Sequence, residues 1–554
     1  MLPPKPFEVI ALSLSGGGYR AAAFHLGTMT YLDMVQFEDR SLLERVKVLS
    51  TVSGGTFTGV KYAVNVQQGK GIRECYREMY RFMKDVPLVD TALGNLSAKT
   101  WNRYKTRNII NAFSEVYFNE LTGETFGTLM KGDLNHLEEI SFNSTDFSNG
   151  LYFRFQKTSG NKGLFGNGYH HFDIEMVKEI RLADIIASSS CFPAGFEPIS
   201  FPADFRNDKA ENFNAYAKKL LKDHPGDFPI YLMDGGVYDN QGINSVLMAN
   251  ERMKKIPDYQ GKQNPIDLYF ISDVSSPFLD PLVIKTSPEK GWLSWISFAR
   301  LENLGGLALL LTLASALSLI VWQCKGVVIF YSLLGTLLLL ISILFLFFGN
   351  LMIRYVPKWF HVPVYFMKPL EFFNRMHFST YKNMIVSRVE SVMKMVSDVF
   401  MKQIRRLSYD RVYNDPVWND RLIMNAVHEL IPVSIVKRVK KPDIQLPDEI
   451  LHPGKRIEHI ATNAHEMGTT LWFTPEQLAG EENTLDSLIA CGQFTACFNL
   501  LEYIEKLRAE NDYKNYPEPL KEEINRMYTA IWEDWTEFKK NPFWFKNKFY
   551  PGNG

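Results

Sequence analysis

The sequence predicts an α/β fold, and three apolar stretches are the observations that predict it. FEVIALSLS over residues 7–15 runs into three glycines, and VKVLSTV over residues 46–52 runs into a serine and two glycines. FPIYLMD ends at Asp234, before two more glycines. Each stretch is compatible with a β-strand, and glycine interrupts each one. A helix-like run follows the first two stretches, so the order is strand, tight turn and helix, as in proteins with a mostly parallel sheet.

The composition is that of a globular chain with several domains. The 554 residues exceed what one core holds and correspond to roughly three or four domain-sized units. Lys and Arg together number 61, as do Asp and Glu, so no basic excess points to a nucleic-acid partner. Five cysteines are too few for a disulfide framework, and we expect reduced, mostly buried thiols: Cys75, Cys191, Cys324, Cys491 and Cys497.

Two long runs without charge predict a transmembrane helical hairpin over residues 304–351. Gly305–Trp322 and Gly326–Gly349 contain no charged residue, and only three residues separate them. Crossing a bilayer takes about 20 apolar helical residues. Arginine and lysine flank the outer ends, which places those ends in the cytoplasm by the positive-inside tendency. A pair of buried core helices and a hairpin that re-enters one leaflet are the alternatives.

The glycines of SGGGYR, residues 15–20, predict a loop that binds an anion. A glycine turn that enters a helix presents free backbone N–H groups and the positive end of the helix dipole. The anion is either a phosphate or an oxyanion that forms during a reaction. A Walker A loop is excluded because no Lys-Ser or Lys-Thr follows. A relaxed GxGxxG loop with Ala21 in the last position, and a tight turn without chemistry, stay open.

A serine and an aspartate occupy the other two turns. Ser53 follows a strand and precedes a plausible helix start, and such a sharp turn exposes the serine Oγ. Thr51 stands where a GxSxG motif has its first glycine. Asp234 ends a strand, and carboxylates at strand ends of α/β folds point into the ligand crevice. An ordinary Asp-Gly turn is the alternative.

In this order, GGGYRA, TVSGG and DGG resemble the motifs of the patatin-like phospholipase family, GGGx[RK]G, GxSxG and DG[GA]. ASSSCFPAGFEPI, Ala187–Ile199, resembles the small-residue helix and proline-bearing loop of the same family. The resemblance covers roughly residues 7–280, and Ala21 and Thr51 depart from it. It implies a patatin-like three-layer α/β/α core with a mostly parallel sheet. With the hairpin, it implies a membrane-anchored member of bacterial type.

The resemblance also implies a site and a reaction. Ser53 would be the nucleophile and Asp234 its base, in a Ser-Asp dyad without histidine. The reaction would be lipid ester hydrolysis of the phospholipase A or lysophospholipase type, with membrane lipid as substrate and without metal or cofactor. Arg20 would orient the loop or lie near a phosphate head group. The resemblance assigns the oxyanion hole to four backbone N–H groups: those of Gly16, Gly17, Gly18 and Gly54.

Other residues compete for the role of base. His25 lies one turn into the first helix, where packing is the simpler interpretation. Asp273, in YFISDVSSP, is a second carboxylate at a strand end. The adjacent pair His170 and His171 is a weaker candidate, and Asp239 with Asn240 could support the loop. The His465-Glu466 pair starts like HExxH, but Thr469 replaces the second histidine, which disfavours a zinc protease.

We expect four segments along the chain. They are a catalytic domain (1–290), the membrane hairpin (304–351), a helical continuation of the catalytic domain (355–510) and an aromatic and basic tail (511–554). Residues 485–508 predict an amphipathic helix that packs in the core. The tail suits either a membrane interface or packing on the domain. VKRVKKP, residues 436–442, is a basic cluster that either touches anionic lipid or lies in solvent.

Two other functions stay open at this point. One is an inactive membrane scaffold that binds lipid or a partner, and the other is a nucleotide-binding membrane protein. The apolar N-terminal run is too short for a secretory signal, so we expect the catalytic domain on the cytoplasmic side of a membrane that the chain crosses twice.

Overall fold

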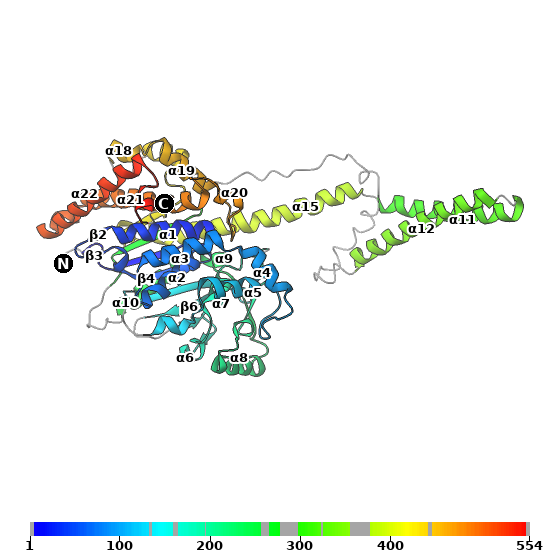
Figure 1. The fold of residues 1–554 in the computed structure, drawn as a ribbon, viewed down its shortest axis with the longest axis horizontal. Coiled ribbons are helices and arrows are strands. Elements are labelled where there is room, and N and C mark those ends of the chain that lie inside the picture. Colours follow the sequence, from blue (N-terminus) through cyan, green and yellow to red (C-terminus); the bar gives the residue numbers. More distant parts are fainter. Residues whose placement is uncertain are drawn as a thin grey trace. The chain divides into compact units, whose positions relative to one another are not determined.

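A computed structural model describes residues 5–131, 136–158, 164–193, 195–255, 265–276, 297–322, 325–354, 377–440 and 446–549. The chain forms two compact units. Unit 1 comprises residues 1–278 and 400–554, and unit 2 comprises residues 279–399 (Figure 1).

A ten-stranded sheet forms the centre of unit 1, in the order β12-β11-β1-β4-β5-β6-β7-β8, with β10 on β5 and β9 on β10. The five strands from β12 to β5 are mutually parallel, and the remaining pairs are antiparallel. The bounds are β1 Ile10–Leu14, β4 Val46–Val52, β5 Glu139–Asp146, β6 Leu151–Lys157, β7 Leu164–Gly166, β8 His171–Phe172, β9 Ile199–Phe201, β10 Ile230–Asp234, β11 Leu268–Asp273 and β12 Leu422–Ala426.

Helices cover both faces of this sheet, as the predicted three layers require. On one face, α1 (Gly18–Met34), α2 (Gly54–Gln67) and α21 (Thr484–Ala509) enclose the larger apolar core. On the other face, α10 (Ile243–Lys255) and α16 (Met401–Tyr413) cover a smaller core. The α/β prediction is therefore confirmed.

The two central helices α1 and α21 contact each other through their backbones. A Cβ on Gly27 would lie 2.0 Å from the carbonyl oxygen of Ile489, and one on Gly492 would lie 2.1 Å from that of Phe24. Side chains on both helices are buried over most of their lengths. The predicted helix at 485–508 is therefore present, but it is surrounded by protein along its first five turns and is not amphipathic there.

The region after residue 400 is mostly helical. Its further helices are α17 Pro432–Lys440, α18 Asp448–Leu451, α19 Lys455–Glu466, α20 Pro475–Leu478, α22 Glu518–Lys540 and α23 Trp544–Phe549. The aromatic tail packs on unit 1, since Trp535 and Phe538 are buried and the Tyr31 ring lies 5.8 Å from that of Phe538. In the basic cluster, Arg438 forms an ion pair with Glu429.

The remaining α-helices of unit 1 come from the part of the chain before residue 278. They are α3 Ile72–Asp85, α4 Leu88–Ser97, α5 Ile109–Val116, α6 Ile174–Val177, α7 Leu182–Ser189, α8 Glu211–Asp223 and α9 Gly236–Asp239. Of the five cysteines, Cys324 lies outside the described residues, and the other four are free and buried.

Unit 2 contains the predicted hairpin as two helices, α11 (Phe298–Trp322) and α12 (Lys325–Arg354), which pack against each other. It also contains α15 (Phe378–Lys394). The transmembrane part of the prediction is not supported, because none of the helices in the described ranges is both long enough and apolar enough to pass through a bilayer.

Candidate active site

Ser53 lies on a strained turn between β4 and α2. Its backbone has φ 49° and ψ −119°, a conformation that residues other than glycine rarely adopt. The Ser53 N–H donates a hydrogen bond to Ser189 Oγ at 2.9 Å, and this bond ties the turn to the end of α7. Ser53 is 6% exposed, so little of its surface reaches solvent. The predicted sharp turn is present.

The departure at Thr51 is accommodated by a glycine on the following helix. A Cβ on Gly59 would lie 2.3 Å from the Thr51 methyl group, so the absence of a side chain at Gly59 makes room for Thr51. The Thr51 hydroxyl bonds to Thr56 Oγ1 at 2.9 Å, and Thr56 bonds in turn to Ser189 at 2.9 Å. The threonine thus joins the polar network beneath Ser53.

The structure brings Ser53 and Asp234 together. The Ser53 hydroxyl donates a hydrogen bond to Asp234 Oδ2 at 2.6 Å. Strand β5 explains the meeting, because its Asn143 pairs with Val52 on β4 and its next residue, Ser144, pairs with Asp234 on β10. Strand β10 runs antiparallel to β5, so Asp234 is not at the end of a parallel strand as its motif alone would indicate.

Burial raises the pKa of the Asp234 carboxyl group and so makes it a stronger base. Loss of solvent raises its pKa from 3.8 to about 6, and hydrogen bonds from Ser53 and the Gly236 N–H oppose this rise. The Gly236 N–H donates to Oδ1 at 2.7 Å, which leaves Oδ2 directed at Ser53. A pKa near 6 leaves the group mostly ionised at neutral pH and makes it a stronger base than an ordinary aspartate.

The glycine loop lies against the serine turn. The Gly16 N–H donates to the Asn240 carbonyl oxygen at 2.9 Å, so this N–H is not free to bind an anion, contrary to the prediction. A Cβ on Gly16 would lie 3.1 Å from Ser53 Cβ, so the loop closely approaches the nucleophile. Gly17 and Gly18 follow with φ of 146° and 61°, values that favour glycine.

Two helix N-termini meet at Ser53. Helix α1 begins at Gly18 and α2 begins at Gly54, and a Cβ on Gly54 would lie 2.1 Å from the Gly18 carbonyl oxygen. Neither first turn carries an acidic residue. Within the described part of the chain, the N–H groups of Gly17, Gly18 and Gly54 have no acceptor. The arrangement can therefore stabilise a negative charge beside the serine.

Arg20 ties α1 to the segment after α19. Its guanidinium donates to the carbonyl oxygens of Met467 at 2.7 Å and His465 at 3.3 Å. The neighbouring Tyr19 N–H donates to Thr470 O at 2.8 Å, so the HEMGTT segment fastens the start of α1. Burial lowers the Arg20 pKa to about 10, which leaves it charged at neutral pH. Of the two predicted roles, this geometry matches orientation of the loop.

His25 is a buried packing residue that braces the glycine loop. Its Nε2–H donates to the Ser15 carbonyl oxygen at 2.9 Å, and its Nδ1 accepts from the Ser272 hydroxyl at 2.7 Å. Burial lowers its pKa to about 4, so it is neutral at pH 7. Both ring nitrogens are occupied, and neither bonds to Ser53.

The other candidate bases are directed elsewhere. Asp273 faces Arg405 at 3.1 Å, and this cation holds the carboxyl pKa down at about 2 despite burial, too low for an efficient base. The His170 ring packs on Phe228 at 5.0 Å, and His171 is exposed on the short strand β8. Asp239 accepts from the Asn244 N–H at 2.7 Å and so caps the start of α10. No group of three or more metal-binding side chains occurs among the residues that the structure describes.

The sequence does not single out two of the supporting residues, Ser189 and Asn143, and it indicates a third, Asn240, without a specific contact. Ser189 accepts from the Ser53 N–H and donates to the Asn143 carbonyl oxygen at 2.6 Å. Asn143 lies on β5, and its amide donates to the Thr51 carbonyl oxygen at 2.9 Å. Asn240 was named only as general support, yet its carbonyl binds Gly16. Ser189 falls within ASSSCFPAGFEPI, whereas the sequence holds no signal for Asn143.

Aromatic rings extend from the helix N-termini to the surface. The Tyr19 ring lies 5.8 Å from that of Phe57, and the Phe57 ring lies 5.0 Å from that of Tyr117. The Tyr117 ring lies 6.1 Å from that of Phe113, whose ring lies 5.2 Å from Phe196. The surroundings of the site are therefore apolar on this side.

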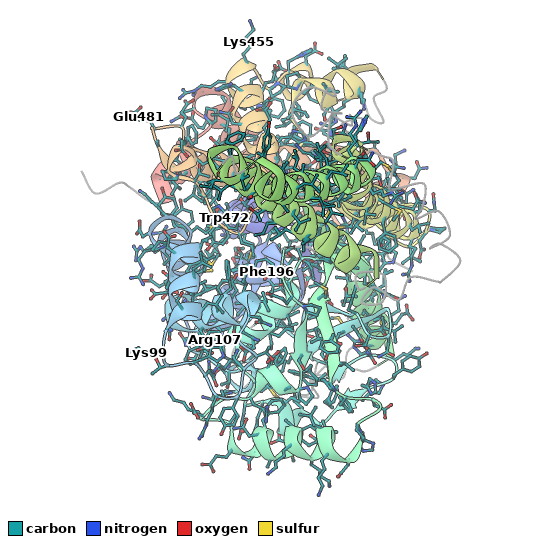
Figure 2. All side chains as sticks on the ribbon, turned by 90° about the vertical axis from the view of Figure 1, so that its right-hand side faces the viewer. Lys99, Arg107, Phe196, Lys455, Trp472 and Glu481 are labelled. Atoms are coloured by element: carbon teal, nitrogen blue, oxygen red, sulfur yellow. The ribbon has the colours of Figure 1, made fainter. Side chains whose placement is uncertain are left out.

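Two loops that hold the site also carry surface aromatics. Phe196 follows α7 in the loop whose Cys191 carbonyl accepts the Asp234 N–H at 2.9 Å. Trp472, which is 40% exposed, lies two residues after Thr470. Figure 2 shows Phe196 and Trp472 on one face of unit 1, between Arg107 on one side and Lys455 on the other.

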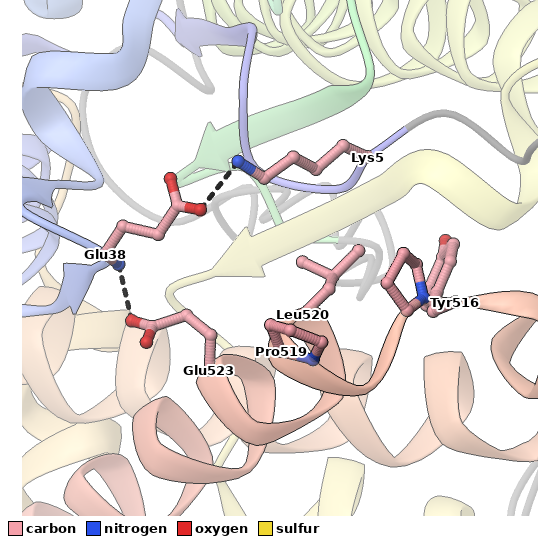
Figure 3. A pocket seen from close by; sticks show the side chains of 7 residues that line it. Lys5, Glu38, Tyr516, Pro519, Leu520 and Glu523 are labelled. Atoms are coloured by element: carbon pink, nitrogen blue, oxygen red, sulfur yellow. Dashed lines mark hydrogen bonds and ion pairs between the residues drawn. The ribbon is translucent and has the colours of Figure 1, made fainter.

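A separate hollow of about 380 Å³ is lined by none of the site residues described above. It lies between the N-terminal segment and the start of α22 (Figure 3). The Lys5 ammonium pairs with Glu38 at 2.7 Å, and the Glu38 N–H donates to Glu523. Its charged side chains already take part in these hydrogen bonds, and the hollow lies apart from Ser53 and Asp234.

The family model for patatin-like phospholipase matches residues 12–247. This range includes the glycine loop, Ser53 and Asp234. No curated protein sequence matches the chain. The match and the geometry above agree on where the site lies. The chain contains a domain of the patatin-like phospholipase family over these residues, and family membership supports lipid hydrolase activity.

Solved structures show a more distant likeness. Human GIVD cytosolic phospholipase A2 is 12% identical with a TM-score of 0.31, and the match covers 49% of this chain and 45% of that one. Its complex with methyl gamma-linolenyl fluorophosphonate is 12% identical, with a TM-score of 0.29 and coverage of 48% and 41%. VipD from Legionella pneumophila is 13% identical, with a TM-score of 0.24 and coverage of 58% and 56%. The chain thus spans about half the length of these proteins.

Proposed function

We propose that the protein is a serine acyl hydrolase that cleaves lipid esters through a Ser53–Asp234 dyad, as a phospholipase A or lysophospholipase. One observation carries this proposal: the Ser53 hydroxyl donates to Asp234 Oδ2 at 2.6 Å, with no histidine between them. The raised pKa of Asp234 matches this carboxylate to proton abstraction at neutral pH.

In the first half-reaction, Asp234 takes the hydroxyl proton as Ser53 Oγ bonds to the ester carbonyl carbon. The carbonyl oxygen becomes an oxyanion, and the N–H groups of Gly17, Gly18 and Gly54 would hold it. Loss of one such donor typically costs about 2.7–4 kcal/mol of barrier. The carbon–oxygen bond to the alcohol then breaks, and Asp234 returns the proton to the leaving alkoxide.

In the second half-reaction, water releases the acyl group. Asp234 takes a proton from the water molecule as its oxygen bonds to the acyl carbon, and the same N–H groups hold the second oxyanion. When the bond to Ser53 breaks, the proton passes from Asp234 to Oγ, which restores the hydrogen bond of the resting site. The positive ends of α1 and α2 favour negative charge at this point in both halves.

An apolar substrate fits the surroundings of the dyad. The rings from Tyr19 to Phe113 are buried and make the interior beneath this face apolar, and the half-buried Phe196 continues the apolar region outwards. Trp472 adds an exposed indole ring on the same face as Phe196 (Figure 2). Long-chain lipid esters are the substrate class that gains most from such contacts.

A location at a lipid surface is part of the proposal. Leu310, Leu313 and Leu317 on α11 are 64%, 57% and 66% exposed, and Phe330 and Leu340 on α12 are both 64% exposed. Exposed apolar area of this kind marks a site of interaction. Liposome flotation tests the idea: replacing Leu310 and Leu317 by glutamate is expected to leave the protein in the dense fraction, while co-flotation of the variant would contradict it. The cytoplasmic location of unit 1 stays a prediction.

Labelling with a fluorophosphonate tests the dyad. Such a probe phosphonylates an activated serine, so wild-type protein should become labelled and Ser53→Ala should not. The matched control is Ser190→Ala, because Ser190 is a buried serine in the same region that donates to Ile186 O at 2.8 Å. A folded wild type that is not labelled would overturn the proposal and favour an inactive scaffold that binds lipid.

A further inference from the structure

Strand β11 ends in a buried ion pair that lies next to the glycine loop. Asp273 is the last residue of β11 and is completely buried. Its Oδ2 accepts the Tyr409 hydroxyl at 2.7 Å, faces Arg405 Nε at 3.1 Å and accepts the Gln241 amide at 3.3 Å. Arg405 and Tyr409 lie four residues apart on α16, so both reach Asp273 from one helix face.

The other carboxylate oxygen of Asp273 shapes the turn that follows. Oδ1 accepts the Ser275 N–H at 2.8 Å, which folds residues 273–275 back on themselves. The turn is therefore held from both sides, by its own backbone at Oδ1 and by α16 at Oδ2. The nearby Arg405 charge keeps this carboxylate ionised.

The same turn contacts the glycine loop directly at Val274. The Val274 N–H donates to Ser15 Oγ at 3.1 Å. Its side chain is completely buried, and a Cβ on Gly17 would lie 2.4 Å from Val274 Cγ2. The Val274 side chain therefore occupies the space that a Cβ of residue 17 would need, and Gly17 also has a φ of 146°, which favours glycine.

A second contact runs through Ser275. The Asn240 amide donates to Ser275 Oγ at 2.9 Å, and the Asn240 carbonyl accepts the Gly16 N–H at 2.9 Å. The 273–275 turn thus determines the position of two consecutive loop residues, Gly16 through Asn240 and Gly17 through Val274. The next residue of the loop, Gly18, opens α1.

We propose that Asp273, Arg405 and Tyr409 are positioning residues that hold the 273–275 turn, and through it the Gly17 and Gly18 N–H groups, in the geometry that stabilises an oxyanion. None of the three contacts Ser53 or Asp234 through a hydrogen bond in the described structure. They act through Val274 and Asn240. The catalytic part of this inference rests on the proposed function of the glycine loop.

Tyr409→Phe provides the mildest test, because it removes one hydrogen bond to Asp273 and keeps the aromatic ring. Arg406→Gln is the matched control, since Arg406 is exposed on the same helix. Two kinds of quantity are measured on the full-length chain: amide hydrogen exchange of Ser15 and Gly16, whose N–H groups are hydrogen-bonded to Ser272 O and Asn240 O, and kcat and KM for a short-chain ester. A hydrogen bond to a charged group corresponds to about a tenfold change in either quantity.

We expect Tyr409→Phe to speed exchange of Ser15 and Gly16 about tenfold and to lower kcat about tenfold, with KM within about twofold of wild type. Arg405→Lys retains the charge and should restore part of the kcat that Arg405→Gln loses. Exchange at the loop that equals wild type, or a change spread evenly over unit 1, would overturn the positioning role. If exchange changes as expected but wild type has no esterase activity, the positioning stands and the proposed function fails.

Discussion

Asp234 shows at the level of one residue how burial and function are coupled. The carboxylate is 3% exposed, and among the residues that the structure describes its hydrogen bonds come from the Ser53 hydroxyl and the Gly236 N–H. The same desolvation that raises its pKa to about 6 also makes the charged form costly for folding.

The pH dependence of activity follows from this pKa. The base must be deprotonated, so kcat/KM should rise with pH along a limb of slope one centred near pH 6, and at pH 5 it should be about tenfold below the plateau. Steady-state kinetics with a short-chain ester between pH 4 and 8 measures the limb. A limb centred near pH 4 would contradict the assignment, because it would indicate an unperturbed carboxyl group.

The same ionisation that raises activity above pH 6 lowers the stability of the fold. Because the pKa in the folded state exceeds the ordinary value of 3.8, the charged Asp234 destabilises the fold above pH 6, and this cost disappears as pH falls through 6 towards 3.8. Asp234→Asn should therefore raise the melting temperature at pH 8 while it lowers kcat by about 10²–10⁴-fold. The gain in melting temperature should vanish near pH 4, and a gain that is equal at both values would indicate another cause.

Thr51 and Gly59 form a pair that can be tested by a double-mutant cycle. Gly59→Ala places a methyl group against the Thr51 methyl and should lower the free energy of unfolding by about 1–3 kcal/mol. Thr51→Ser keeps the hydroxyl bond to Thr56 and removes the methyl group. The double variant should therefore be more stable than the sum of the single effects predicts, as chemical denaturation can measure. Additive effects would show that the methyl group added by Gly59→Ala and the Thr51 methyl group do not clash.

At the scale of elements, the crossing of α1 and α21 depends on two glycines that touch opposing backbone. Backbone atoms cannot rotate away as side chains can, so an added methyl group must separate the helices. The contact lies in the middle of α1, at Phe24–Thr28, and the first residue of the same helix belongs to the glycine loop.

We expect Gly27→Ala and Gly492→Ala each to destabilise unit 1 by about 1–3 kcal/mol, although alanine favours helix more than glycine does. Gly94→Ala is the control, because Gly94 lies in α4 with open space around it and should gain up to about 1 kcal/mol. Thermal unfolding measures all three. A stabilised Gly27→Ala variant would show that the helices separate at little cost.

At the scale of the whole molecule, unit 1 is assembled from two distant parts of the chain. Strand β12 from residues 422–426 extends the sheet beside β11, and α21 fills the core against α1. Both come after residue 400, whereas Ser53, Asp234 and the glycine loop precede residue 278.

The segment 1–290 should therefore not fold by itself. Without α21 and β12 it would expose the apolar face of α1 and one edge of β11, which are buried in unit 1. Calorimetry should show no cooperative transition for residues 1–290 and a restored transition when residues 400–554 are added in trans. A cooperative transition of the first fragment alone would contradict this expectation.

The sequence by itself determined the local features of the site. Strand β4 was predicted with its observed bounds, and the three glycine turns were located, because apolar runs and glycine are signals of short range. Ser53 and Asp234 were chosen on those turns together with a resemblance between motifs. The sequence shows that Thr51 departs from the family pattern, but it does not show why the departure is tolerated.

Only the tertiary structure decided which groups meet. Residues that lie 181 positions apart, Ser53 and Asp234, come within 2.6 Å because both flank β5. Arg405 beside Asp273 makes this carboxylate a poor base, and the Asn240 carbonyl oxygen accepts the Gly16 N–H, which the sequence alone predicts to be an oxyanion donor. A pKa and a free donor depend on the neighbours in space, and strand order and helix packing, which no short sequence window contains, select those neighbours.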